Sequence, residues 1–131
     1  MRNAMGPMLM LAAISPLSAH AAGAAGQIVL GAHHQTHADQ TLQNDVLGMA
    51  HNAVPAITMH YAGQQAIACG RMELQDTVVT TMPASGAWRE TWTWRVCDTM
   101  LSLPIDFKPS PQGGTDFTFA GREARVAKAT N

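Results

Sequence analysis

Charged and aromatic side chains are scarce in this chain. Only 13% of its 131 residues are charged, about half the share found in an ordinary globular domain, and only 5% are aromatic. Eight basic residues against nine acidic ones leave a formal charge of −1 at pH 7. A near-neutral chain with so few cations lacks the electrostatic basis for binding nucleic acid or an anionic membrane, so we expect neither as a partner.

The motifs of common catalytic sites are also missing. The sequence contains no G-x-S-x-G elbow, no H-E-x-x-H pair, no phosphate-binding loop and no dinucleotide fingerprint. Its acidic residues follow no spacing that favours a catalytic pair. We therefore expect a protein that is not an enzyme and uses no cofactor, and we keep a small hydrolase or an inhibitor as an alternative.

The longest apolar run lies near the N-terminus and is short. It covers residues 8–14, after a start that carries one basic and no acidic residue, and the small-residue sequence Ala19-His20-Ala21 follows it. This order is typical of a secretory signal peptide over residues 1–21, removed after Ala21. No later stretch approaches the roughly 20 apolar residues of a membrane helix. We expect a periplasmic or secreted protein with no membrane span.

Two cysteines, Cys69 and Cys97, remain after this cleavage. In an oxidising compartment such a pair is expected to form one disulfide. The loop that it would close is about 28 residues long, and on the chain-entropy model this closure stabilises the fold by about 3.5 kcal/mol. Because neither a C-x-x-C redox pair nor the close partners of a zinc site occur, we predict a structural disulfide.

The rest of the chain divides into a leader, one domain and a tail. Residues 22–38 are small and polar, which predicts a flexible leader. Apolar residues at helical spacing predict an amphipathic helix over residues 39–51, with Asp39 capping its first turn. We expect a single domain over residues 39–121, followed by a loose C-terminal tail at residues 122–131.

Pro55 is expected to prevent the helix from continuing, and beyond it the hydrophobic period changes to two. Alternation over residues 57–61 and 72–81 predicts strands, and residues 88–97 and 101–107 predict a hairpin. A last short strand follows a turn rich in proline and glycine. The expected class is α+β, with one amphipathic helix packed on a four- or five-stranded antiparallel sheet. A small β-sandwich or partial barrel is the alternative.

Three short motifs lie close together in the C-terminal part. They are W-R-E-T-W-T-W-R-V-C at residues 88–97, L-P-I-D-F-K-P at 103–109 and G-G-T-D-F at 113–117. This combination of a Trp-x-x-x-Trp strand ending in cysteine, a Pro-containing strand and a Gly-Gly-Thr-x-Phe turn resembles small exported bacterial proteins of unknown function. The resemblance implies export and a small β-rich domain, and it brings no catalytic residues.

A histidine cluster is the first candidate site. His33, His34 and His37 form an H-H-x-x-H pattern, and imidazole binds zinc, copper and nickel, which an exported protein meets in the periplasm. A specific site needs ligands held rigidly by further contacts, whereas these lie in the expected leader. We interpret them as a solvated polar segment and keep a periplasmic metal-handling protein as an alternative function.

The second candidate site is on the strand at residues 88–97, where alternation places Trp88, Glu90, Trp92 and Trp94 on one face. They could form a stacking platform for sugar or peptidoglycan, with Glu90 accepting hydrogen bonds from hydroxyl groups. Alternatively, a chain with so few aromatic residues needs at least two of these tryptophans in its core. Glu90 would then need a partner, for which Arg71 is one candidate.

The function that best fits these observations is a small exported, disulfide-stapled binding or interaction module without enzymatic activity. Its partner is expected to be an unknown protein or a ligand of the cell envelope.

Overall fold

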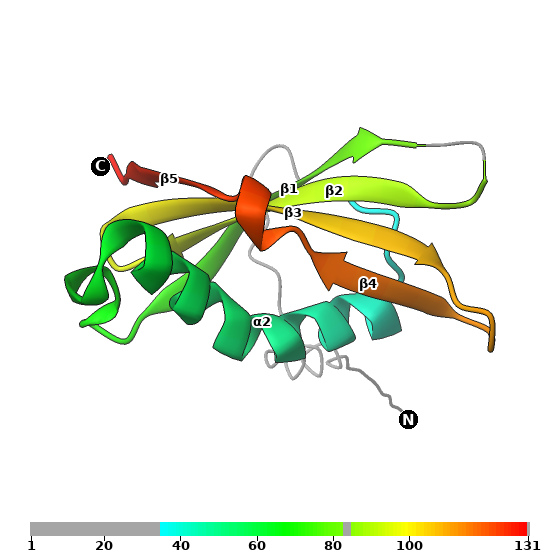
Figure 1. Cartoon of the computed structure of the whole chain (residues 1–131), viewed down its shortest axis with the longest axis horizontal. Helices are drawn as coiled ribbons and strands as arrows, with labels where there is room; N and C mark the ends of the chain where they lie inside the picture. The colour runs from blue at the N-terminus through cyan, green and yellow to red at the C-terminus, as the bar shows by residue number, and fades with distance from the viewer. Residues whose placement is uncertain (1–34, 83–84, 131) are drawn as a thin grey trace, which may run out of the picture.

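The computed structural model describes residues 35–82 and 85–130 of the chain. Within them, one α-helix packs on one face of an antiparallel sheet of five strands, which confirms the predicted α+β class (Figure 1). The helix is α2 (Gln40–Ala62), and the short 3-10 helices η2 (Gln64–Ile67) and η3 (Gly121–Glu123) precede β1 and β5. The strands are β1 (Met72–Thr81), β2 (Trp88–Val96), β3 (Thr99–Pro109), β4 (Thr115–Phe119) and β5 (Arg125–Lys128).

Hydrogen-bonded caps hold both ends of α2. The Asp39 carboxylate accepts a hydrogen bond from the Leu42 amide at 2.9 Å, as predicted for the first turn. At the other end Gly63, whose φ of 90° favours glycine, donates its N–H to the Met59 carbonyl. One stripe of the helix faces the sheet at four-residue spacing, formed by Leu42, Val46, Ala50, Val54 and Thr58.

The helix is longer than predicted because it continues through Pro55. A proline in a helix interior removes a backbone donor and costs about 3 kcal/mol. On either side of it, Val54 and Thr58 are fully buried, and the Thr58 hydroxyl donates to the Val54 carbonyl at 2.8 Å. Since packing against the sheet continues past the proline, residues 57–61 are helical and their prediction as a strand is wrong.

The sheet is a meander in the order β1-β2-β3-β4, and β5 also pairs with β3. The predicted hairpin is present as β2 and β3, which the two residues Cys97 and Asp98 connect. On its other side, β3 pairs with β4 over residues 105–109 and with β5 over residues 99–102. Pro104 therefore lies in the gap between these two partners, where a missing backbone donor disrupts the ladder least.

The C-terminal segment predicted as a loose tail contains β5, so that prediction is wrong. Val126 packs against the core from β5, and just beyond the strand the Ala129 amide donates to the Asp98 carbonyl at 2.7 Å. A strand of four residues is too short to produce a readable alternation. β5 instead pairs with the part of the β3 edge that β4 leaves unpaired.

The core lies between α2 and the face of the sheet that α2 covers. Fully buried side chains come from the helix stripe and from alternate positions of β2 and β3, which are Trp92, Trp94, Leu101, Leu103, Ile105 and Phe107 in the strands. No helix among the residues that the structure describes is both long enough and apolar enough to cross a bilayer.

Candidate functional site

A fully buried carboxylate, that of Glu90, lies on the helix-facing side of β2. Its Oε2 accepts hydrogen bonds from the Thr36 hydroxyl at 3.1 Å, the His37 amide at 2.9 Å and the Trp88 indole at 2.7 Å. Its Oε1 accepts one from the Trp92 indole at 2.7 Å. We call these five residues the Glu90 cluster. All four donors are uncharged, and within residues 35–82 and 85–130 Glu90 forms no ion pair.

The strand period builds this cluster locally. Residues two apart in β2 point to the same side, so Trp88 and Trp92 flank Glu90 and turn their indole N–H groups toward its carboxylate. Trp88 is also stacked on Phe107, its register partner in β3, with ring centroids 4.7 Å apart and planes at 9°. The remaining two donors come from Thr36 and His37, which no alternation in the strand could indicate.

The tryptophan platform that the sequence suggested is not present as a set. Trp92 and Trp94 are 0% and 1% exposed and belong to the core, which leaves them no free ring face for a sugar. Trp88 is half-buried, and the oxygens of Glu90 are used by the cluster. Arg71, considered as a partner for Glu90, forms no ion pair with it, so the expected pairing is wrong. Its backbone is bonded to the two cysteines.

The expected flexible leader is ordered where it meets the sheet. Besides the bonds from Thr36 and His37 to Glu90, the Gln35 amide donates to the Thr77 carbonyl of β1 at 2.6 Å, and Ala38 is buried. The leader prediction is therefore wrong for residues 35–38. A polar composition indicated flexibility, but these residues satisfy a buried carboxylate and a strand edge instead.

Of the three histidines, the structure describes only His37, and His33 and His34 lie outside the described residues. The His37 side chain is exposed, and its ring meets Trp88 edge-on with centroids 5.8 Å apart. Within the described parts of the chain, no three His, Cys, Asp or Glu residues are grouped as metal ligands. The interpretation of His33, His34 and His37 as a metal site thus stays a prediction.

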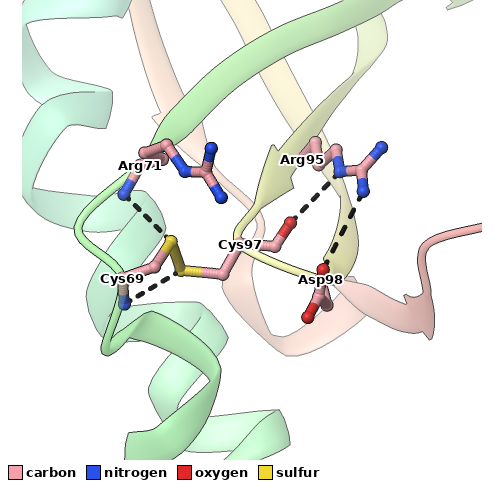
Figure 2. The surroundings of a disulfide bond; sticks show 5 residues. All are labelled: Cys69, Arg71, Arg95, Cys97 and Asp98. Carbon is pink, nitrogen blue, oxygen red and sulfur yellow. Dashed lines mark hydrogen bonds and ion pairs between the residues drawn. A yellow bond between two sulfur atoms is a disulfide. The ribbon is translucent and has the colours of Figure 1, made fainter.

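The predicted disulfide joins Cys69 and Cys97, whose Cα atoms are 5.8 Å apart (Figure 2). Cys69 lies between η2 and β1, and Cys97 is the first residue of the β2–β3 turn, with a φ of 54°. The bond therefore ties the segment after the helix to the hairpin at one end of the sheet. Arg95 donates to the Cys97 carbonyl at 3.1 Å and pairs with Asp98 at 3.9 Å.

The face of the sheet opposite α2, here called the outer face, is polar. Alternation and register place on it the side chains Arg89, Thr91, Thr93, Arg95, Met100, Ser102, Pro104 and Asp106, all partly exposed. Hydroxyl groups dominate its centre, where the Thr93 and Ser102 side-chain oxygens are 3.3 Å apart. This face differs sharply from the apolar face beneath α2.

Arg89 is held in place on the outer face by two carboxylates. Its Nε and Nη2 donate to Asp106 at 2.7 and 2.8 Å, and its Nη1 and Nη2 donate to Glu123 at 2.7 and 3.0 Å. Hydrogen bonds from Arg89 hold the pKa of both carboxyl groups below their ordinary values, and those bonds raise the pKa of Arg89 itself. Since these side chains are 29%, 49% and 58% exposed, solvent screens the pairs strongly.

A pocket of about 470 Å³ opens beside this ion-pair group. It is lined by Thr81, Ala87, Trp88, Arg89, Asp106, Phe107, Lys108 and Thr118. Sequence reasoning missed both features. Arg89 and Asp106 could have been paired, because both alternate outward in the predicted hairpin and oppose each other in its register. Glu123 lay in the segment predicted as a loose tail, where no pattern indicated a partner.

A comparison of this chain with protein-family models, with curated proteins and with solved structures gave no match.

The two faces of the sheet differ in what they can do chemically. In the Glu90 cluster both carboxylate oxygens accept hydrogen bonds from within the protein, so the cluster joins residues 36–37 to β2. The outer face carries partly exposed hydroxyl groups, a fixed guanidinium and the exposed Lys108 beside a pocket. A second pocket, of about 340 Å³, lies between α2 and η3, so the outer face is one of two surfaces among the described residues that could contact another molecule.

Proposed function

We propose that this chain is a small exported, disulfide-stapled binding or interaction module without catalytic activity, which binds its partner through the outer face. The observation that carries the proposal is the contrast between the two faces of the sheet. α2 and the Glu90 cluster occupy one face, whereas the other presents partly exposed polar side chains and a pocket. One face supplies most of the buried apolar area, and the other is left for recognition.

Rigid placement of the outer-face groups supports this proposal. Arg89 is held by four hydrogen bonds, so it loses little conformational freedom when a ligand arrives. Lys108, at the rim of the pocket, is exposed and has no ion pair within residues 35–82 and 85–130. The pocket therefore suits a ligand that offers a carboxylate or several hydroxyl groups.

Export is supported by two independent features. The disulfide is typical of an oxidising compartment, and the first 21 residues have the order of a signal peptide. Intact-mass measurement of protein recovered from outside the cytoplasm should give a chain that starts at Ala22. A soluble cytoplasmic product that retains residues 1–21 would contradict export.

Binding is tested by titrating isotope-labelled protein with soluble peptidoglycan fragments and with a peptide panel while amide chemical shifts are recorded. We expect saturable shifts confined to β2, β3 and the pocket residues Thr81 and Thr118. Thr93→Arg, which places a long side chain in the centre of the outer face, should weaken binding at least tenfold. The control Asn52→Arg, on the exposed side of α2, should leave it unchanged. Shifts confined to α2, or no saturable shift with any probe, would contradict the proposed surface.

A further inference from the structure

The disulfide lies at the surface, and its two cysteines differ in exposure. Cys69 is exposed in the short segment between η2 and β1, whereas Cys97 is half-buried in the β2–β3 turn. We therefore expect a thiolate from solvent to reach Cys69 more readily than Cys97. Thiol–disulfide exchange depends on this access and on how well the departing sulfur is stabilised as a thiolate.

Each sulfur has a backbone N–H directed at it. The Cys69 amide donates to Cys97 Sγ at 3.2 Å, and the Arg71 amide donates to Cys69 Sγ at 3.3 Å. A disulfide sulfur is only a weak acceptor, but a thiolate carries a full charge and accepts such bonds far more strongly. These donors thus favour the reduced, charged sulfur over the oxidised one, and they are in place before the bond opens.

Arg71 adds a cation at the same place. Its N–H contacts Cys69 Sγ and its carbonyl accepts from the Cys97 amide at 3.2 Å, so its backbone lies against both cysteines. Figure 2 shows the Arg71 side chain extending on the side of the two sulfurs, whereas Arg95 turns toward Asp98. The carboxylate of Asp98 is thereby paired with Arg95.

We propose that this disulfide is a site of thiol–disulfide exchange, entered at Cys69, for the dithiol of an exported thiol–disulfide oxidoreductase. The thiolate of that dithiol attacks Cys69 Sγ and forms a new S–S bond. The Cys69–Cys97 bond breaks, and Cys97 leaves as a thiolate that the Cys69 amide stabilises. The second thiol of the partner then attacks the mixed disulfide, which releases Cys69 as a thiolate. Two electrons pass to this chain, and the partner becomes a disulfide.

This inference goes beyond the proposed function, because the disulfide and the pocket lie at opposite ends of the β2–β3 hairpin. Failure of outer-face binding would leave the exchange site untouched, and the reverse holds as well. A purely structural disulfide would need neither an exposed cysteine nor backbone donors directed at its sulfurs.

The test measures how fast dithiothreitol reduces the oxidised protein at low ionic strength. Arg71→Met removes the guanidinium and keeps both backbone bonds. Loss of a nearby unit charge in water-like surroundings slows the formation of a thiolate, so this variant should be reduced about twofold to fivefold more slowly. The difference should shrink when salt is added. Arg122→Met, which removes an exposed arginine of η3, is the matched control and should match the parent protein.

A second measurement tests where the attack occurs. The parent protein is treated with reduced glutathione, quenched with acid and mapped by mass spectrometry. We expect the glutathione adduct on Cys69. An adduct on Cys97, resistance of the folded protein to both reagents, or equal reduction rates for Arg71→Met and the parent would each overturn the proposal. Unchanged thermal midpoints of the oxidised arginine variants separate an effect on exchange from an effect on folding.

Discussion

Replacing Glu90 by glutamine tests the Glu90 cluster most directly, because the two side chains have the same shape. Glutamine has one acceptor oxygen where the carboxylate has two. If its amide nitrogen took the Oε2 position, it would face three donors from Thr36, His37 and Trp88. The less damaging placement puts the nitrogen at the Oε1 position, against the Trp92 indole N–H that lies 2.7 Å away.

The size of the effect follows from these contacts. Trp92 is fully buried, so its N–H would lose its acceptor with no water to replace it, at about 1–3 kcal/mol. The three remaining bonds would weaken as the acceptor becomes neutral. Removing a buried charge, by contrast, raises the free energy of unfolding. Four short hydrogen bonds already replace the hydration of Glu90, so we expect the loss of hydrogen bonding to exceed the gain from removing the charge. Glu90→Gln should therefore lower the free energy of unfolding by about 2–4 kcal/mol.

Equilibrium unfolding in urea, followed by circular dichroism on the oxidised protein, measures this change. Glu73→Gln is the matched control, because Glu73 is exposed on β1, and we expect it to stay within about 0.5 kcal/mol of the parent. If Glu90→Gln were as stable as the parent or more stable, the buried charge would outweigh its hydrogen bonds. The assignment of the Glu90 cluster as a stabilising element would then be refuted.

Three further outcomes are expected. Cys97→Ser should lower the free energy of unfolding by about 2–5 kcal/mol in denaturant titrations, and two free thiols in the unreduced parent protein would contradict the disulfide. Arg89 lowers the pKa of both of its carboxylate partners, so its ion pairs stabilise the protein above the ordinary carboxyl values and lose this contribution as the pH falls through the lowered ones. Arg89→Met should therefore unfold with a shallower dependence on pH below about pH 5, and an unchanged slope would contradict this reading. Calorimetry with zinc and copper should detect only weak binding, and a submicromolar one-to-one isotherm that disappears when His33, His34 and His37 are all alanine would favour the metal-handling alternative.

Local patterns were sufficient where the contacts that decide structure lie close in sequence. The hairpin of β2 and β3 follows from its alternation and short connection, and the start of α2 follows from its Asp39 cap. The end of α2 could not be predicted, because the effect of Pro55 depends on how much packing Val54 and Thr58 gain from the sheet. That gain exists only once the sheet is in place.

The candidate sites divide in the same way. Alternation placed Trp88, Glu90 and Trp92 on one face, but it could not decide between a ligand platform and a core. Long-range contacts decide for the core. Thr36 and His37 lie more than fifty residues away in sequence and donate hydrogen bonds to the Glu90 carboxylate. A polar composition predicts a flexible segment, but such a segment becomes ordered where its donors satisfy a buried acceptor.

Short-range periods were enough to predict the α+β class, the β2–β3 hairpin and the side of β2 that carries the tryptophans. The sequence also pointed to the Cys69–Cys97 bond, since the chain has no other cysteine to pair. Long-range contacts decided three other features: Thr36 and His37 complete the Glu90 cluster, β5 pairs with the free edge of β3, and Arg89 reaches Glu123. These arrangements join segments distant in sequence, and their energy comes from satisfying buried groups and open strand edges that no local pattern records.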